Sequence, residues 1–116
     1  MAMIYKMTLF IYDRINIPQI LPQKSNLVEA VLCAEIKKKV GLTSQDIEKN
    51  NIVVTNEQIT WNDKVDEGLE VEFTKGEIEL IQKSFIKLSD DNNFPTDVKF
   101  LTFYQKFVEP IPEKVE

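Results

Sequence analysis

Apolar and acidic residues alternate at residues 69–74, and this is the clearest two-residue period in the chain. The alternating residues are Leu69, Glu70, Val71, Glu72 and Phe73. Because successive side chains of a strand point to opposite faces, the pattern predicts a strand with one buried and one acidic face. Residues 3–12 are apolar and β-prone and predict a strand covered on both faces, and residues 52–61 predict two short strands around a polar turn.

The most regular helical period begins after Asn26. Asn26 with Glu29 resembles a capping box, with Ser25 as the alternative cap. Apolar residues then recur at helical spacing until Gly41 ends the helix: Leu27, Val28, Val31, Leu32, Ile36 and Val40. We expect this set to face the core.

Three further helices are predicted by their caps. Thr43 with Asp46 indicates a short helix to about residue 50, and Thr74 with Glu77 indicates a longer one. The longer helix has a narrow apolar stripe of Ile78, Ile81, Phe85 and Leu88, while Leu80 and Ile86 lie off it and suggest extra apolar surface. Thr96 is expected to cap the last helix, residues 97–108.

Residues 13–22 carry two prolines, Pro18 and Pro22. Each proline removes a backbone donor and restricts the residue before it, so a long regular element is not expected here. The segment is nevertheless too apolar for a free loop. We predict a connection packed on the core, with a short helical turn around residues 15–20 left open.

This order of elements predicts an α+β fold. We expect a small, mainly antiparallel sheet made of the N-terminal strand, the hairpin and the acidic strand, covered by three to four helices. Residues 1–108 would form a single compact domain, and residues 109–116 a proline-containing acidic tail.

The formal net charge is −5, and it is concentrated in the second half of the chain. No basic stripe exists that would attract a phosphate backbone, so direct nucleic-acid binding is not expected. The run Lys37-Lys38-Lys39 falls at a helix end, where it opposes the negative end of the dipole. No apolar run is long enough to span a membrane and no secretory signal is visible. Together with the single cysteine, the missing signal favours a reducing compartment.

Catalytic and metal-binding residue types are scarce. The chain has no histidine and one cysteine, Cys33, which we interpret as a core residue of the first capped helix. Its three glycines are scattered, so no phosphate-binding loop is present. The run of acids and amides at residues 90–93 lacks the spacing of a calcium loop. We therefore expect no enzyme, no metal site and no cofactor.

Two groups of residues are candidates for partner binding. The first is the acidic segment around the alternating strand: Asp63, Asp66, Glu67, Glu70, Glu72 and Glu77. It could steer a basic protein surface, or it could simply keep the chain soluble. The second is the aromatic stripe of the last helix, which could be core or an interface: Phe100, Phe103, Tyr104 and Phe107.

Several short motifs resemble those of a family of small bacteriophage and prophage proteins. They are "ILP" at residues 20–22, a "KKxGLT"-like element at 38–43, "ITWN" at 59–62, "VEFTxxExxLI" at 71–81 and "YxKF" at 104–107. The resemblance covers most of the chain and implies a phage or prophage origin, but it assigns no activity and no functional residues.

Together these observations predict a non-catalytic, phage-encoded protein that binds a host or phage protein. Inhibition of a host defence system or host enzyme is the first hypothesis. A structural or assembly component of the phage particle is the alternative. The first hypothesis places the protein in the host cytoplasm, and the alternative places it in the virion. A homo-oligomer remains open.

Overall fold

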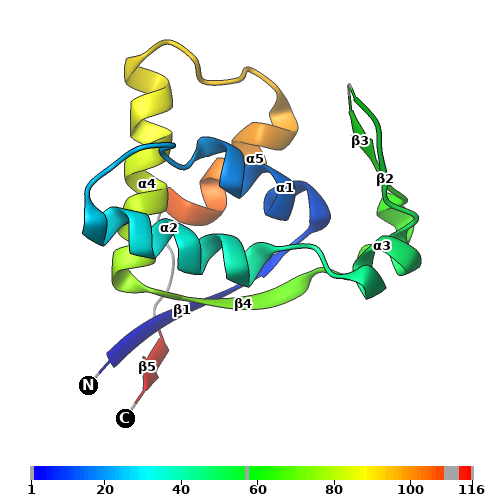
Figure 1. The fold of residues 1–116 in the computed structure, drawn as a ribbon, viewed down its shortest axis with the longest axis horizontal. Helices are drawn as coiled ribbons and strands as arrows, with labels where there is room; N and C mark the ends of the chain where they lie inside the picture. Colours follow the sequence, from blue (N-terminus) through cyan, green and yellow to red (C-terminus); the bar gives the residue numbers. More distant parts are fainter. Residues whose placement is uncertain (1, 57, 109–112, 116) are drawn as a thin grey trace.

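The protein has an α+β fold in which the helices lie on one side of a small antiparallel sheet (Figure 1). The fold is seen in a computed structural model, which describes residues 2–56, 58–108 and 113–115. In chain order the elements are β1 (Ala2–Leu9), α1 (Ile11–Ile20), α2 (Leu27–Val40), α3 (Ser44–Asn50), β2 (Val53–Val54), β3 (Ile59–Thr60), the 3₁₀ turn η1 (Asp63–Val65), β4 (Leu69–Thr74), α4 (Lys75–Asp90), α5 (Val98–Val108) and β5 (Glu113–Val115).

The main sheet has the strand order β4-β1-β5, and both pairings are antiparallel. The register of β1 and β4 runs from Ile4 opposite Thr74 to Leu9 opposite Leu69. Strands β2 and β3 pair only with each other, so the expectation that the hairpin joins the main sheet is wrong. The hairpin follows α3, which carries it to one end of the molecule, away from β1 (Figure 1).

The C-terminal part of the chain contributes a strand that the sequence pattern did not indicate. Residues 113–115 form β5 beside the start of β1. The other residues of the predicted tail, 109–112 and 116, lie outside the described residues. Pairing with β1 depends on a long-range contact, which no local pattern in so short a segment announces.

Helix α1 corrects two expectations at once. The first strand ends at Leu9 instead of residue 12, and the predicted connection is a ten-residue helix that contains Pro18. Its side chains Ile11 and Ile17 are fully buried, and this burial outweighs the hydrogen bond that the proline removes. The Asp13 carboxylate accepts a hydrogen bond from the Phe10 N–H at 2.9 Å and so satisfies a donor at the helix start.

Helix α2 has the predicted bounds and cap, but not the predicted buried face. The Asn26 side chain accepts from the Glu29 N–H at 2.9 Å. Cys33, Ile36 and Val40 are buried, whereas three expected core residues are largely exposed: Leu27 (81%), Val28 (70%) and Val31 (55%). One face of α2 packs on α1, α4 and β4, and no described element covers the opposite face.

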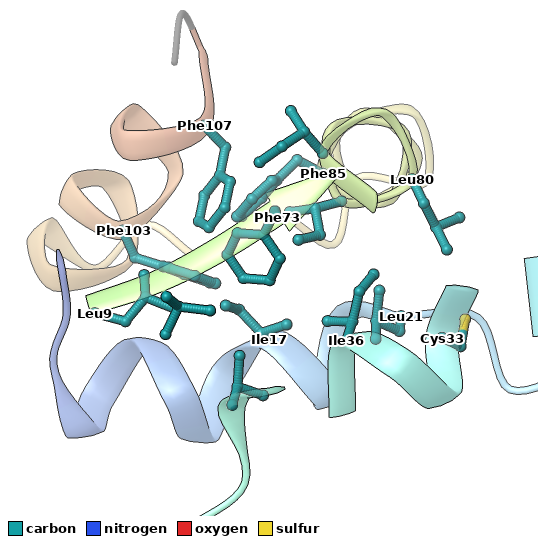
Figure 2. Packing of buried hydrophobic residues seen from close by; sticks show 14 of the residues in the cluster. Leu9, Ile17, Leu21, Cys33, Ile36, Phe73, Leu80, Phe85, Phe103 and Phe107 are labelled. Carbon is teal, nitrogen blue, oxygen red and sulfur yellow. The ribbon is translucent and has the colours of Figure 1, made fainter. Parts of the chain in front are cut away.

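The core is dominated by phenylalanines brought together by α4, α5 and β4 (Figure 2). The ring of Phe85 of α4 is surrounded by four rings of α5, whose centroids lie 5.0–5.9 Å from its own: Phe100, Phe103, Tyr104 and Phe107. Aromatic pairs in such geometries add stability beyond their buried area. Leu80 is also buried, contrary to expectation, while Ile86 is exposed as expected. The interior is therefore a cluster of aromatic side chains that lies against strands β1 and β4 of the main sheet.

The caps of the other helices are mostly those predicted. Thr74 and Glu77 form a reciprocal box, as do Thr43 and Asp46. The last helix begins one residue later than expected, because Asp97 and not Thr96 accepts at its start: the Lys99 N–H donates to Asp97 Oδ1 at 3.1 Å. Among the described residues, no helix is both long and apolar enough to cross a membrane.

Candidate functional site

The outward face of the main sheet is the most open polar surface that the sequence predicted. Register places Glu72 opposite Lys6 and Glu70 opposite Thr8, all exposed. The Lys6 ammonium lies 3.8 Å from Glu70 and 3.7 Å from Glu72, distances at which an exposed ion pair contributes little. Both carboxylates therefore remain available to a cation from outside the molecule.

Strand β4 also has a free edge. It pairs with β1 on one side, and none of the other described strands pairs with it. A shallow groove of about 380 Å³ follows residues 69–74 along this strand, with Lys39 on its rim. An unpaired strand edge presents backbone N–H and C=O groups that can accept a further strand. The acidic face and the open edge are parts of one element, and we refer to them together as the β4 surface.

Glu77 does not belong to this surface. Its side chain is only 2% exposed, and its carboxylate accepts from the Thr74 N–H at 2.8 Å and from Lys39 Nζ at 2.5 Å. The prediction that Glu77 contacts a partner is therefore wrong. Its position as the third residue of α4 turns it back to cap the helix, and Lys39 of α2 neutralises the buried charge.

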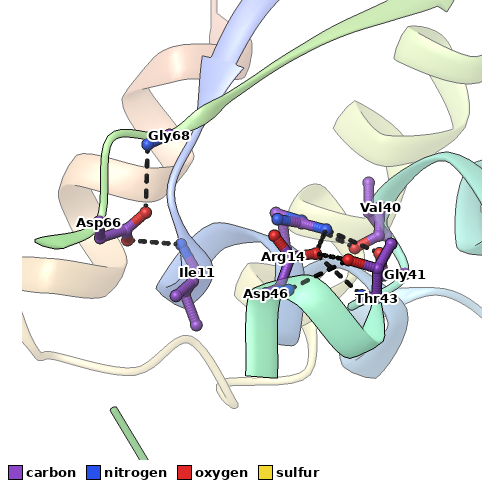
Figure 3. A network of polar contacts seen from close by, with 8 residues as sticks. All are labelled: Ile11, Arg14, Val40, Gly41, Thr43, Asp46, Asp66 and Gly68. Atoms are coloured by element: carbon purple, nitrogen blue, oxygen red, sulfur yellow. Dashed lines mark hydrogen bonds and ion pairs between the residues drawn. The ribbon is translucent and has the colours of Figure 1, made fainter. Parts of the chain in front are cut away.

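Asp66 is also engaged within the molecule. Its Oδ2 accepts from the Ile11 N–H at 2.8 Å, and its Oδ1 accepts from the Gly68 N–H at 3.1 Å (Figure 3). It thereby joins the start of α1 to the turn before β4. Gly68 has φ +80, and an added Cβ would lie 2.5 Å from the Thr8 side chain, so this turn requires glycine.

The remaining predicted acids point to solvent. Asp63 lies in η1 and is exposed. Glu67 is exposed as well, and it pairs with Lys49 at 3.1 Å on the surface. Of the six acids predicted to bind a partner, Asp63, Glu67, Glu70 and Glu72 are thus accessible, and Glu70 and Glu72 lie on one strand face.

The aromatic stripe of α5 belongs to the core. Phe100, Phe103 and Phe107 are buried, and Tyr104 is half-buried with its ring 5.4 Å from Phe94. The three phenylalanines of this stripe are therefore core residues, whereas Tyr104 remains partly accessible. Periodicity alone identifies an apolar face but not what covers it.

A buried arginine that no sequence pattern singled out joins three helices (Figure 3). Arg14 Nε donates to the Val40 carbonyl at 3.1 Å, and its Nη2 donates to the Gly41 carbonyl at 2.7 Å and to Asp46 Oδ2 at 2.9 Å. The Arg14 hydrogen bond lowers the pKa of Asp46 to about 2. We call this group the Arg14 clip. It satisfies the carbonyls at the end of α2, so its role is structural.

No metal-binding arrangement is found among the described residues. Among these residues, no three acidic or cysteine side chains lie close enough together to hold a metal ion. Cys33 is buried in the core, as expected, and this burial raises the pKa of its thiol. A thiol in such surroundings is a poor nucleophile.

The chain matches no protein-family model, no curated protein and no solved structure.

Proposed function

We propose that this protein acts without catalysis by binding another protein through the β4 surface. The observation that supports the proposal is the combination, on one six-residue strand, of an open edge with two exposed carboxylates. Main-chain pairing at such an edge provides affinity, and alternate side chains provide specificity.

The chemistry of the strand indicates an extended, basic partner segment. Lys or Arg residues at alternate positions would lie on the same face as Glu70 and Glu72. A second copy of β4 is a poor occupant, because symmetric antiparallel pairing would bring carboxylates of the two copies together. The charges thus select against self-association while favouring a cationic strand.

The resemblance to bacteriophage proteins extends the proposal to a host. The protein would occupy a basic surface of a host defence protein or host enzyme in the host cytoplasm and inhibit it. The absence of histidine and the burial of the single cysteine support a role by occupancy instead of chemistry.

Affinity capture from host lysate tests this function. We expect one stoichiometric partner whose retention falls with salt and by about tenfold in the variant Glu70→Lys/Glu72→Lys. The matched control is Glu35→Lys/Glu48→Lys, which changes net charge equally at exposed positions outside the main sheet. Salt-insensitive capture, or equal loss in both double variants, would contradict a role for the β4 surface.

A structural component of the phage particle is the second candidate. The exposed apolar face of α2 around Leu27, Val28 and Val31 favours it, since contiguous apolar surface commonly marks an assembly contact. Mass spectrometry of purified particles separates the two functions. Stoichiometric presence of the protein in particles would support the second candidate and count against the first.

A further inference from the structure

The β2–β3 hairpin stands as an arm beside α1, at the end of the molecule remote from β5 (Figure 1). Its root is held by the Asn62 N–H, which donates to the Asn50 carbonyl at 2.8 Å, and by the buried side chain of Ile52. Beyond this root the arm has only two paired residues on each strand. A cleft of about 380 Å³ separates it from α1.

Both walls of the cleft present apolar side chains that do not fill it. Pairing of Val54 with Ile59 places these residues on one face of the arm, and Trp61, two residues further on, shares that face. Tyr12 and Ile15 line the opposite wall from α1. Val54 nevertheless remains 69% exposed, so apolar surface on the inner wall is left without a covering.

None of the described residues that line the cleft carries a formal charge, although charged residues make up 28% of the chain. Its polar lining consists mainly of side-chain amides: Asn16, Gln19, Asn56 and Gln58. Asn16 Nδ2 donates to the Tyr12 carbonyl at 2.7 Å, whereas the amides of the other three form no hydrogen bond with any described residue. Burial, together with the carboxylates of Asp97 and Asp13, raises the pKa of the Tyr12 phenol above its ordinary value of 10.0, and the phenol is neutral at pH 7.

We infer that this cleft binds a short, extended polypeptide segment that carries apolar and no charged side chains. Each free amide offers a donor and an acceptor, the same pair that a peptide backbone requires. The aliphatic side chains of Ile15, Val54 and Ile59 on the two walls suit apolar side chains and disfavour a hydroxyl-rich saccharide. A phosphate-bearing ligand would find no cationic side chain among the described residues that line the cleft.

This site is independent of the β4 surface and differs from it in chemistry. Binding at β4 depends on carboxylates and weakens as salt screens them, whereas binding at a neutral cleft does not. The two proposals can therefore fail separately.

The test uses displayed libraries of short random peptides, selected on the full chain in about 0.5 M sodium chloride, where the Debye length is roughly 4 Å. A selected peptide is then synthesised and titrated while the emission of Trp61, the only tryptophan, is followed. We expect convergent sequences without charged residues, a change in Trp61 emission, and an affinity that is independent of salt. The Glu70→Lys/Glu72→Lys variant should bind this peptide unchanged.

Two matched pairs of variants locate the binding. Val54→Asp places a charge on the inner face of the arm, and Val53→Asp places it on the outer face. Gln19→Lys charges the α1 wall, while Gln23→Lys charges an exposed position outside the cleft. We expect a loss of affinity of about tenfold or more for Val54→Asp and Gln19→Lys, and less than about twofold for their controls.

The variants Gln19→Lys and Gln23→Lys keep the test valid if the arm variants disturb the hairpin. Gln19 is exposed on α1, which is a different element. Four results would overturn the inference. The first two are a selection that enriches no sequence and a selection of basic peptides whose binding the β4 variant abolishes. The other two are a Trp61 response to neutral oligosaccharides but not to peptides, and equal losses of affinity in Gln19→Lys and Gln23→Lys.

Discussion

The helical body and the β2–β3 arm are stabilised in different ways. In the body, Phe85 lies among four aromatic rings contributed by α5, and β4 closes the cluster from below. In the arm, two-residue strands expose Val53 and Val54, and few contacts beyond the root hold it. Long-range apolar burial stabilises the body, whereas the arm relies on local hydrogen bonds. Stability is thus concentrated in the body, which includes the α1 wall of the proposed peptide cleft, while the wall formed by the arm can adjust to an occupant.

Removal of the central ring should give the largest effect. Phe85→Ala leaves a cavity at the centre of the aromatic cluster and is expected to lower the free energy of unfolding by about 3–5 kcal/mol. Urea denaturation followed by far-UV circular dichroism measures this loss. A cost below about 1 kcal/mol would show that the cluster does not stabilise the body.

Opening the Arg14 clip should cost slightly less. Arg14→Met keeps much of the side-chain volume but leaves the Val40 and Gly41 carbonyls and the Asp46 carboxylate without their donor. We expect a loss of about 2–4 kcal/mol by the same measurement, since buried acceptors lose their partners. The exposed substitution Lys24→Met serves as the control and should change stability by less than about 0.5 kcal/mol. An equal effect of the two substitutions would contradict the role of the clip.

A falling pH should weaken the Arg14 clip before it affects the β2–β3 arm. Because folding lowers the pKa of Asp46 from 3.8 to about 2, its contribution is complete above pH 3.8 and is lost as the pH falls through about 2. We expect the wild type to lose about 1–2 kcal/mol more than Asp46→Asn between neutral pH and pH 2. Urea midpoints of both proteins across this range give the comparison, and parallel pH profiles would contradict it.

The arm should show the smallest effect on global stability and the greatest local opening. Val54→Ala removes mostly exposed surface, so we expect a change within about 0.5 kcal/mol. In native-state hydrogen exchange, amides of residues 53–60 should exchange by local opening, and those of α4 only near the global free energy of unfolding. Exchange of both regions at the same free energy would show that arm and body unfold as one unit.

Local signals in the sequence were sufficient for most of the elements. The capping pairs Thr74–Glu77 and Thr43–Asp46 act within four residues, so their helices were predictable. Alternation at β4 likewise identified Glu70 and Glu72 as an outward pair. The same local reasoning failed for Glu77, because a cap and a solvent-exposed acid look alike until the helix packs on Lys39.

Distant contacts were beyond such reasoning. The residues that Arg14 joins lie 26 to 32 positions away in the chain, and no local pattern reports them. The buried face of α2 was misjudged because its apolar positions surround much of the helix, and only the placement of α1 and α4 determines which of them are covered. The peptide cleft has no motif at all, since its walls belong to α1 and a hairpin whose relative placement depends on α3.

By itself, the sequence determined which segments are helix or strand wherever caps and periods act over a few residues, and it determined the acidic face of β4. The tertiary structure alone decided that the α5 phenylalanines are core, that residues 11–20 form a helix despite Pro18, and that the hairpin stands apart from the sheet. The physical reason is range. Capping and alternation are set by neighbouring residues, whereas burial depends on which distant surfaces meet, and burial supplies most of the free energy that selects one fold.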